Sequence, residues 1–543
     1  MNEKLTKDRA KAHVEQTKNR AKASLQRGKR SIFSRIAKIV FHRAFFVSLA
    51  IALQLAVLAV AVTVFLRHFA LFYLFYAIIA TAAVLKIISG RYEAAYKIAW
   101  IVPVLAVPVF GGLMYLLYGG NKLSKRDKKQ LLQQNQCVQR NMGPPQRTTL
   151  EYLAEQGGDA ITQSRYIHSA SCCPPHLHTE TEYYPLGDDV FVAMKQALEQ
   201  AEKFIFVHFF IIRPGKMWNE ILEILERKAA EGLDVRVIYD DVGCLYTLPG
   251  NYDKILQKKG IACEVFNRYR PVVSLRLNNR DHRKMLIIDG KIGFTGGINL
   301  ADEYINEEVR FGHWKDSGIR LHGEGVWNMT VSFLATWAYL TGKEDDFEAF
   351  RPRVSPLEIA TDGVVQFFED SPLDDKPVGA NAYHNMIAKA NRYIYFTTPY
   401  LIVDDAMTNS LCAAAQAGVD VRIITPHIPD KKIVFQLTRA HYQILLESGV
   451  RIYEYTPGFI HAKNFVVDDT YATVGTINMD YRSLYLHFEC GVWMANSSAV
   501  RRVREDFMKT LEVCEEISLE DAKRFSRRRR FLNAFLRAFA PLF

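Results

Sequence analysis

The sequence predicts an α/β protein in which one α/β sandwich unit occurs twice, behind a group of N-terminal transmembrane helices. Three observations predict this architecture. Strand-like apolar runs alternate with helical stretches in the main part of the chain, blocks of sequence recur in the same order in its two halves, and three apolar runs precede it. Two similar halves that pack face to face bring matching residues together across a pseudo-two-fold axis. We therefore expect one site built from both copies.

The N-terminal leader, residues 1–43, carries nearly all of the net charge. It holds 13 Lys or Arg residues against Glu3, Asp8 and Glu15, whereas the whole chain of 543 residues has a net charge of +11. Basic segments beside an apolar run are retained in the cytoplasm and are attracted by anionic lipid headgroups. We predict a basic cytoplasmic leader with an anionic bilayer surface as its partner. Because the remaining chain is nearly neutral, we expect no nucleic-acid partner.

Three uncharged apolar runs predict transmembrane helices at 44–66, 69–85 and 98–118. A helix as long as the first run rises about 35 Å, which is enough to cross a hydrocarbon core about 30 Å thick. The second run is at the lower limit for a span, so the alternative is a segment that re-enters or lies in the interface. Basic residues also follow the third run, and three spans cannot place both basic segments in the cytoplasm. The sequence predicts a multi-pass membrane protein and leaves the side of its main domain open.

The remaining chain divides at changes in composition. A polar, helix-prone linker covers 119–179, and the first α/β half covers 180–342. A charged run and two prolines mark an inter-half linker at 343–361, after which the second half covers 362–520. The end of the chain, 521–543, combines four consecutive arginines with apolar residues at helical spacing. This pattern predicts a basic amphipathic helix on the bilayer or, alternatively, a docked C-terminal helix with a solvated charge run.

Three blocks of sequence repeat between the halves. Ala201-Glu-Lys-Phe-Ile-Phe-Val matches Ala390-Asn-Arg-Tyr-Ile-Tyr-Phe, and Gly232-Leu-Asp-Val-Arg-Val-Ile matches Gly418-Val-Asp-Val-Arg-Ile-Ile. Each of these blocks has the pattern of an apolar strand entered from a helix. The third block reads His-x-Lys-x4-Asp-x6-Gly-x-x-Asn in both halves. Three shared blocks in one order indicate a duplicated unit.

The third block contains the residue types that phosphodiester chemistry needs. A strand period of two puts His and Lys of each copy on one face. The two histidines, His282 and His461, supply a nucleophile and a proton donor. Four further side chains are predicted to bind the phosphoryl oxygens: Lys284, Lys463, Asn299 and Asn478. Because two ammonium groups offset the charge of the phosphate, we expect no metal and no cofactor.

Four carboxylates have predicted positioning roles. Asp289 and Asp468 complete the two catalytic motifs, but along an unbroken strand they face away from the phosphate, so we predict that they fix the strand and its turn. A catalytic histidine also needs a partner for its second ring nitrogen. Asp316 and Glu489 follow the histidine of their own half by 34 and 28 residues and precede strand-like runs. They are the predicted histidine-orienting residues.

These motifs resemble the phospholipase D superfamily and, within it, bacterial cardiolipin synthases of the membrane-anchored type. The resemblance includes Thr398-Pro-Tyr-Leu, the segment from Tyr453 to Lys463, and Gly475-Thr-Ile-Asn-Met-Asp-Tyr-Arg-Ser483. It implies a duplicated phospholipase D-like domain at the bacterial plasma membrane. The chain departs from the pattern at His208, where the resemblance leads us to expect an acidic residue.

The resemblance also implies a reaction. A phosphatidyl group passes between two phosphatidylglycerol molecules to give cardiolipin and glycerol. His282 attacks phosphorus and forms a phosphohistidine, while His461 protonates the leaving glycerol and then deprotonates the incoming lipid hydroxyl.

Other functions use the same pair of motifs. They include lipid hydrolysis, phosphatidyl transfer to a different alcohol and nucleic-acid cleavage. The apolar runs favour a lipid substrate, and the nearly balanced charge of the main domain disfavours a nuclease. A non-enzymatic membrane scaffold predicts a disrupted motif, whereas the His, Lys, Asp and Asn positions are intact in both copies. The acceptor lipid, the order of the two histidines and the number of membrane segments stay open.

Overall fold

The computed structural model describes residues 52–60, 62, 69–90, 94–118, 125–268, 279–352, 359, 361–373 and 376–523. The predicted leader, most of the predicted span at 44–66, residues 353–358 and 360 of the inter-half linker and nearly all of the predicted C-terminal helix lie outside the described residues. The elements described below belong to one compact unit that begins at Ala70.

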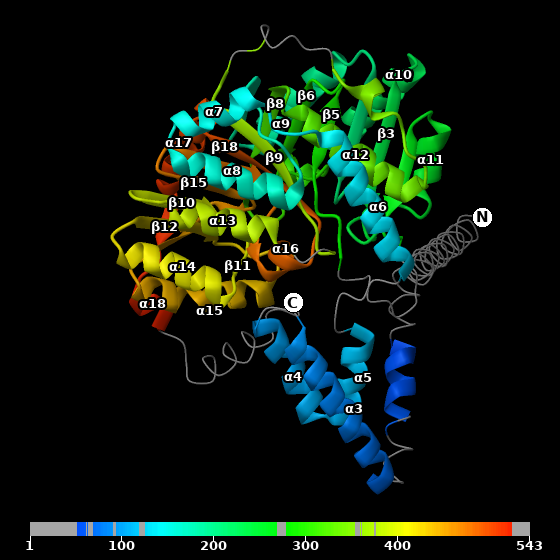
Figure 1. The fold of residues 1–543 in the computed structure, drawn as a ribbon, viewed down its shortest axis with the longest axis vertical. Helices are drawn as coiled ribbons and strands as arrows, with labels where there is room; N and C mark the ends of the chain where they lie inside the picture. Colours follow the sequence, from blue (N-terminus) through cyan, green and yellow to red (C-terminus); the bar gives the residue numbers. More distant parts are fainter. Residues whose placement is uncertain are drawn as a thin grey trace, which may run out of the picture. The chain divides into compact units, whose positions relative to one another are not determined.

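The first half contains a seven-stranded sheet in the order β1-β8-β6-β5-β2-β3-β4 (Figure 1). Strands β2, β3 and β4 are parallel, and the other neighbours are antiparallel. The strands are β1 (Thr179–Tyr184), β2 (Phe204–Phe209), β3 (Asp234–Asp240), β4 (Ala262–Phe266), β5 (Met285–Ile288), β6 (Ile292–Gly296) and β8 (Gly318–Gly323). The helices are α9 (Gly187–Glu199), α10 (Lys216–Ala230), α11 (Tyr252–Lys258) and α12 (Val326–Thr341), with short 3-10 helices η3 (Asp302–Ile305) and η4 (Phe347–Phe350).

The second half contains an eight-stranded sheet in the order β19-β13-β12-β10-β15-β16-β18-β9. Its strands are β9 (Val364–Asp370), β10 (Tyr393–Thr397), β12 (Asp420–Pro426), β13 (Arg451–Tyr455), β15 (Asn464–Val467), β16 (Tyr471–Gly475), β18 (Glu489–Ala495) and β19 (Cys514–Glu516). Its helices are α13 (Val378–Ala388), α14 (Asp405–Gln416), α15 (Lys432–Glu447), α16 (Tyr481–Tyr485), α17 (Ser498–Leu511) and α18 (Leu519–Lys523). Two short parallel pairs complete the fold: β11 (Leu401–Ile402) with β17 (Met479–Asp480), and β7 (His313–Lys315) with β14 (Gly458–Ile460).

The two sheets have the same topology. When the second sheet is read from β9, its order β9-β18-β16-β15-β10-β12-β13 repeats the order of the first sheet strand for strand, and β19 is added at the far edge. The motif strands β5 and β15 occupy equivalent central positions. This topology confirms the predicted duplicated α/β unit.

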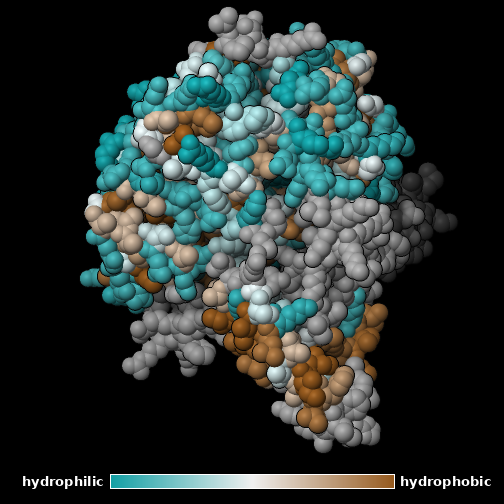
Figure 2. All heavy atoms as spheres, in the orientation of Figure 1, coloured by the Kyte–Doolittle hydropathy of each residue, from teal (hydrophilic) through white to brown (hydrophobic). Residues whose placement is uncertain are grey.

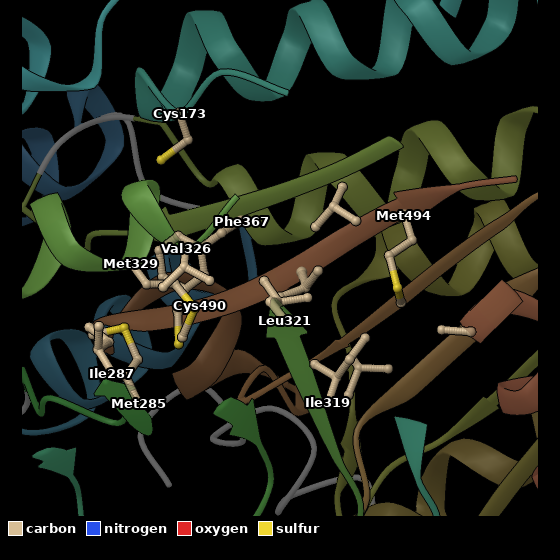
Figure 3. Close-up of a cluster of buried hydrophobic side chains, with 14 of the residues drawn as sticks. Cys173, Met285, Ile287, Ile319, Leu321, Val326, Met329, Phe367, Cys490 and Met494 are labelled. Carbon is tan, nitrogen blue, oxygen red and sulfur yellow. The ribbon is translucent and has the colours of Figure 1, made fainter. Parts of the chain in front are cut away.

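A shared apolar core joins the halves. Met285, Ile287 and Leu321 of the first sheet belong to one buried cluster with Phe367 and Met494 of the second sheet (Figure 3). Each sheet also buries its other face under helices of its own half, α9 and α10 in the first and α13 to α15 in the second. Because each inner face is covered by the other half, the two copies form one sandwich, and their matching ends meet.

The predicted linker is largely helical and packs on both halves. It contains α6 (Lys125–Met142), α7 (Arg147–Glu155) and α8 (Gly158–Ser171). At the end of α6, the Asn141 carbonyl accepts a hydrogen bond of 2.9 Å from the Trp327 indole of the first half. Ile161 and Ile167 of α8 lie in a buried cluster of the second half. The segment therefore packs against both halves and lies outside the two sheets.

The predicted span at 98–118 is a hairpin of two short helices, so the prediction of one continuous span there is wrong. Helix α4 (Ala94–Ala106) ends two residues before α5 (Pro108–Tyr118), because proline disfavours the helical conformation of the residue before it. The rings of Trp100 and Tyr115 lie 5.6 Å apart across the hairpin. A Cβ at Gly111 would lie only 2.1 Å from the Pro103 carbonyl oxygen, so this close approach needs glycine.

The apolar segment before the hairpin forms helix α3 (Phe69–Ser89). Within the described part of the chain, no helix has both the length and the apolar character that a membrane crossing requires. The predicted spans at 69–85 and 98–118 are therefore not supported.

Asp289 and Asp468 hold the turn after each motif strand to the start of a neighbouring strand. The Asp289 carboxylate accepts hydrogen bonds of 2.9, 2.7 and 2.9 Å from the backbone N–H groups of residues 202, 203 and 204. Asp468 accepts three equivalent bonds of 2.6, 2.9 and 2.8 Å from residues 391 to 393. Both aspartates have a left-handed backbone, with φ of 53° and 55°. These contacts support a structural role for the two carboxylates.

We expect Asp289→Ala to lower the free energy of unfolding by about 3 kcal/mol, because three backbone donors lose a charged acceptor. Thermal unfolding of the purified protein measures the loss. Glu202→Ala is the control, since that exposed residue contributes only its backbone N–H to the same turn. Equal melting temperatures for Asp289→Ala and the control would contradict the structural role.

Candidate active site

A cavity of about 550 Å³ lies where the two halves meet. This volume falls in the range of small-molecule sites. Both motif histidines line the cavity, together with residues that follow the other strands of each sheet. The main lining residues are Phe210, Arg280, His282, Asn299, Glu303, Tyr304, Trp314, Tyr400, Phe459, His461, Asn478, Arg482 and His487.

Each motif histidine is fixed by the backbone of the opposite half. The His282 N–H donates to the Phe488 carbonyl at 2.8 Å, and the Phe488 N–H donates to the Arg280 carbonyl at 2.8 Å. In the other copy, β14 pairs with β7, and the His461 N–H donates to the Lys315 carbonyl at 2.7 Å. The cavity therefore has its geometry only when the halves are assembled.

The orienting carboxylates are exchanged between the halves. The Glu489 carboxylate lies 2.9 Å from His282 Nδ1, and the Asp316 carboxylate lies 2.6 Å from His461 Nδ1. Both carboxylates are fully buried. The prediction selected the right two carboxylates but paired each with the histidine of its own half, which is wrong. Because Nδ1–H of each imidazole donates to its carboxylate, Nε2 is the ring nitrogen that is available to the cavity.

The motif lysines lie beneath the histidines. The Lys284 ammonium donates to the His282 carbonyl at 2.6 Å, and the Lys463 ammonium donates to the His461 carbonyl. Lys463 Nζ also lies 2.8 Å from His461 Nδ1. Burial lowers the pKa of Lys284 to about 8 and that of Lys463 to about 7. The two ammonium groups thus supply positive charge from below the site, and this charge is sensitive to pH near neutrality.

Burial also sets the charge of the imidazoles. Burial and the Lys284 ammonium hold the pKa of His282 well below its usual value. Burial and Lys463 lower the pKa of His461 to about 4, although Asp316 opposes this shift. Both rings are therefore neutral near pH 7 before a substrate binds, which is the nucleophilic form of imidazole. An anionic phosphodiester in the cavity favours protonation of one ring.

The two motif asparagines have different surroundings. The Asn299 amide accepts a hydrogen bond of 3.0 Å from the Ile211 N–H and donates one of 2.7 Å to the Tyr304 hydroxyl. The carbonyl oxygen of Asn478 is buried without a hydrogen-bond partner among the described residues. Both amides line the cavity. Asn299 is therefore already engaged in fixing a strand end, whereas Asn478 keeps an unused polar atom for a ligand.

His208, the departure from the family pattern, lies behind the site. Its Nε2 is 2.9 Å from the Asp281 carboxylate, and the Arg283 guanidinium is 2.6 Å from the same carboxylate. Burial raises the pKa of Asp281, but Arg283 and His208 more than offset this effect and lower it. The buried group next to His282 is thus ionised and paired.

Sequence reasoning missed most of the residues that line the cavity, among them Arg280, Arg482 and His487. Spacing could have identified two of these residues as part of the site. His487 precedes the orienting Glu489 by two residues, and Arg280 precedes His282 by two. The ligand atoms of His282, His487 and Glu489 also lie within 4.8 Å of one another. The positive charges of Lys284, Arg280 and Arg482 beside them do not fit a resident divalent cation.

A duplicated α/β sandwich with one His-x-Lys motif from each half at a shared cavity defines a phospholipase D-like protein. A sequence profile described as a cardiolipin synthase, phospholipase D-like domain matches residues 194–310 and 383–511, one segment in each half. A profile described as a phospholipase D-nuclease N-terminal region matches residues 77–120. The crystal structure of phosphatidylserine synthase from Haemophilus influenzae aligns with a TM-score of 0.53 over 70% of this chain and 98% of its own, at 13% identity, which shows a shared fold.

Relatives at higher identity identify the family. A cardiolipin synthase of Halalkalibacterium halodurans is 34% identical over 82% of this chain and 88% of its own length. Cardiolipin synthase 2 of Bacillus anthracis is 34% identical over 82% of this chain and 86% of its own. An uncharacterized protein of Streptococcus mutans is 41% identical over 85% of this chain and 99% of its own. The chain belongs to the cardiolipin synthase family of phospholipase D-like proteins.

Proposed function

We propose that this protein is a phosphatidyltransferase that converts two phosphatidylglycerol molecules into cardiolipin and glycerol. The observation that supports this function best is the pair of exchanged couples, His282 with Glu489 and His461 with Asp316, at one cavity. One couple suits nucleophilic attack and the other suits proton transfer, which are the two roles that phosphodiester exchange needs.

In the first step, His282 Nε2 attacks the phosphorus of one phosphatidylglycerol. A phosphorus–nitrogen bond forms as the bond from phosphorus to the glycerol oxygen breaks. Protonated His461 gives its Nε2 proton to the leaving oxygen, and glycerol departs. Glu489 accepts the Nδ1–H of His282 and so stabilises the positive charge on the phosphorylated ring.

In the second step, the terminal hydroxyl of another phosphatidylglycerol attacks the phosphohistidine. Neutral His461 takes the hydroxyl proton, the phosphorus–nitrogen bond breaks, and cardiolipin forms. His461 then carries the proton needed for the next cycle. Asp316 keeps the Nδ1–H of His461 oriented throughout, so Nε2 exchanges the proton in both steps.

An exposed apolar surface supports a membrane substrate. Large apolar side chains of α3 and α4 are exposed, among them Ile78 at 62% and Leu105 at 61%, and they gather on one part of the surface (Figure 2). Tyr96 of α4 stacks on Tyr481 of α16 at 6.0 Å, and Tyr481 lines the cavity. We propose that this surface contacts the bilayer beside the cavity.

The product assay tests the proposed function. Purified protein in mixed micelles with phosphatidylglycerol is expected to release glycerol and cardiolipin in equal amounts, which mass spectrometry and an enzymatic glycerol assay measure. Phosphatidic acid as the sole lipid product would indicate a hydrolase. The absence of any lipid product would contradict the proposed activity.

The pH dependence should report the motif lysines. We expect kcat/KM for phosphatidylglycerol to fall as pH rises through about 7 to 8, because first Lys463 and then Lys284 lose the charge that attracts the phosphodiester. The lipid phosphate does not titrate in this range, so the free protein determines the alkaline limb. A profile that stays flat to pH 9 would contradict this role of the lysines.

A further inference from the structure

The two sides of the cavity differ at positions that the duplication relates. One wall lies beside His282 and the other beside His461. Three matched pairs line the cavity, each at the same spacing from a motif or orienting residue in its half. In each pair, the first residue belongs to the wall beside His282 and the second to the wall beside His461. The pairs are Arg280 and Phe459, Arg482 and Glu303, and His487 and Trp314.

The wall beside His282, formed by Arg280, Arg482 and His487, is hereafter the cationic wall. Lys431 also lines the cavity, and both arginines and Lys431 act electrostatically on His487. The opposite wall holds two aromatic rings at the matched positions. Its Glu303 is already neutralised by Arg213 at 3.2 Å and Arg310 at 3.1 Å. The matched positions therefore hold two arginines and a histidine on one wall, and two aromatic rings and a paired carboxylate on the other.

His487 marks the cationic wall as a place for a ligand. Its side chain is 13% exposed and lines the cavity, and neither ring nitrogen has a hydrogen-bond partner within the part of the chain that the structure describes. Its ring lies 5.8 Å from that of His282. Burial and the arginines hold the pKa of His487 well below its usual value, so the neutral ring has one N–H to donate. Buried polar groups without a partner call for a ligand or water.

Acidic groups also lie near the cationic wall, among them Glu489, whose carboxylate is 3.9 Å from His487 Nδ1. Arg280 Nη1 lies 3.8 Å from the Asp240 carboxylate, whose pKa burial raises to about 6. Asp480 accepts a hydrogen bond of 2.8 Å from the Ser483 N–H, and burial raises its pKa as well. Asp240 is still mostly ionised near pH 7, so it offsets part of the charge of Arg280. The cationic wall nevertheless presents guanidinium and imidazole N–H groups where the opposite wall has Phe459 and Trp314.

We propose that the cationic wall, formed by Arg280, Arg482 and His487, binds a second phosphodiester, that of the acceptor lipid. The inference rests on the proposed function and deepens it. Joining two phosphatidylglycerol molecules brings two phosphate monoanions into one cavity, separated by a three-carbon bridge. A wall that neutralises the phosphate that does not react would favour an anionic lipid over water or a neutral alcohol as acceptor.

Acceptor competition tests the subsite. Wild-type protein and Arg482→Gln receive phosphatidylglycerol together with deuterated glycerol, a neutral acceptor whose transfer yields labelled phosphatidylglycerol. We expect the ratio of cardiolipin to labelled phosphatidylglycerol to fall about tenfold in Arg482→Gln, since a charge-assisted contact to the acceptor is lost. Transfer to glycerol should stay within about threefold of wild type.

A matched control is Arg320→Gln, the same change at an arginine of β8 that does not line the cavity, which should leave the ratio unchanged. Equal losses of both products in Arg482→Gln would show that Arg482 serves the reacting phosphate or the fold, and an unchanged ratio would also overturn the subsite. His487→Gln, which keeps a hydrogen-bond donor, should lower the ratio less than His487→Ala does. If the wild-type protein forms no cardiolipin at all, the proposed function fails, whereas an unaltered ratio in an active protein rejects the subsite alone.

Discussion

His282→Ala and His461→Ala each reduce cardiolipin formation at least about 10³-fold, because each removes a group that makes or breaks bonds in the proposed reaction. Both rings line the cavity, and a fully buried carboxylate of the other half holds each of them. Nε2 of each ring has a separate task in the proposed reaction, so neither of the two motif histidines replaces the other. Steady-state rates in mixed micelles measure the effect.

The control for these variants is His322→Ala, because His322 lies on β8 and does not line the cavity. This variant should retain the wild-type rate, and circular dichroism should show the same fold in all three variants. A donor labelled at phosphorus and quenched with denaturant at mildly alkaline pH, where a phosphohistidine persists, identifies the nucleophile, since the labelled adduct should be absent in His282→Ala. Wild-type rates in both alanine variants would contradict the assignment of the site.

The sequence was sufficient for the features that local patterns encode. Repeated blocks predicted the duplicated sheet. The period of two predicted that each motif histidine and lysine share one face of a strand, whereas both pairs precede β5 and β15, and the Lys284 ammonium contacts the backbone carbonyl of His282. The odd spacing of Asp289 predicted its position away from the cavity, where it caps the start of β2. These inferences needed only residues close together along the chain.

The features that the sequence did not predict depend on contacts between the halves. Asp316 is 34 residues from His282, and nothing in that spacing reveals that the pairing of β7 with β14 brings Asp316 to His461 instead. The cationic wall also joins residues from both copies, with Arg280 from the first and His487 from the second. The α4–α5 hairpin was missed for a different reason. Its uncharged composition outweighed the break that Pro108 imposes.

A donor with a good leaving group distinguishes the histidine that each carboxylate orients. Asp316→Asn and Glu489→Gln should each slow cardiolipin formation by about 10²- to 10⁴-fold, because the amide misorients the imidazole that it contacts. With a phosphatidyl donor that carries p-nitrophenol, the leaving oxygen needs no proton from His461. Asp316→Asn should then release p-nitrophenolate in a first burst at nearly the wild-type rate, as His461→Ala does.

Glu489→Gln should remain slow with the same donor, as His282→Ala does, because it impairs the nucleophile rather than the acid. The burst of p-nitrophenolate absorbance in a stopped-flow instrument separates the two variants. If each carboxylate served the histidine of its own half, the results would be reversed, with Asp316→Asn slow and Glu489→Gln rescued. Rescue of Asp316→Asn but not of Glu489→Gln would therefore show that each carboxylate serves the histidine of the other half. Only the assembled sandwich places Asp316 at 2.6 Å from His461.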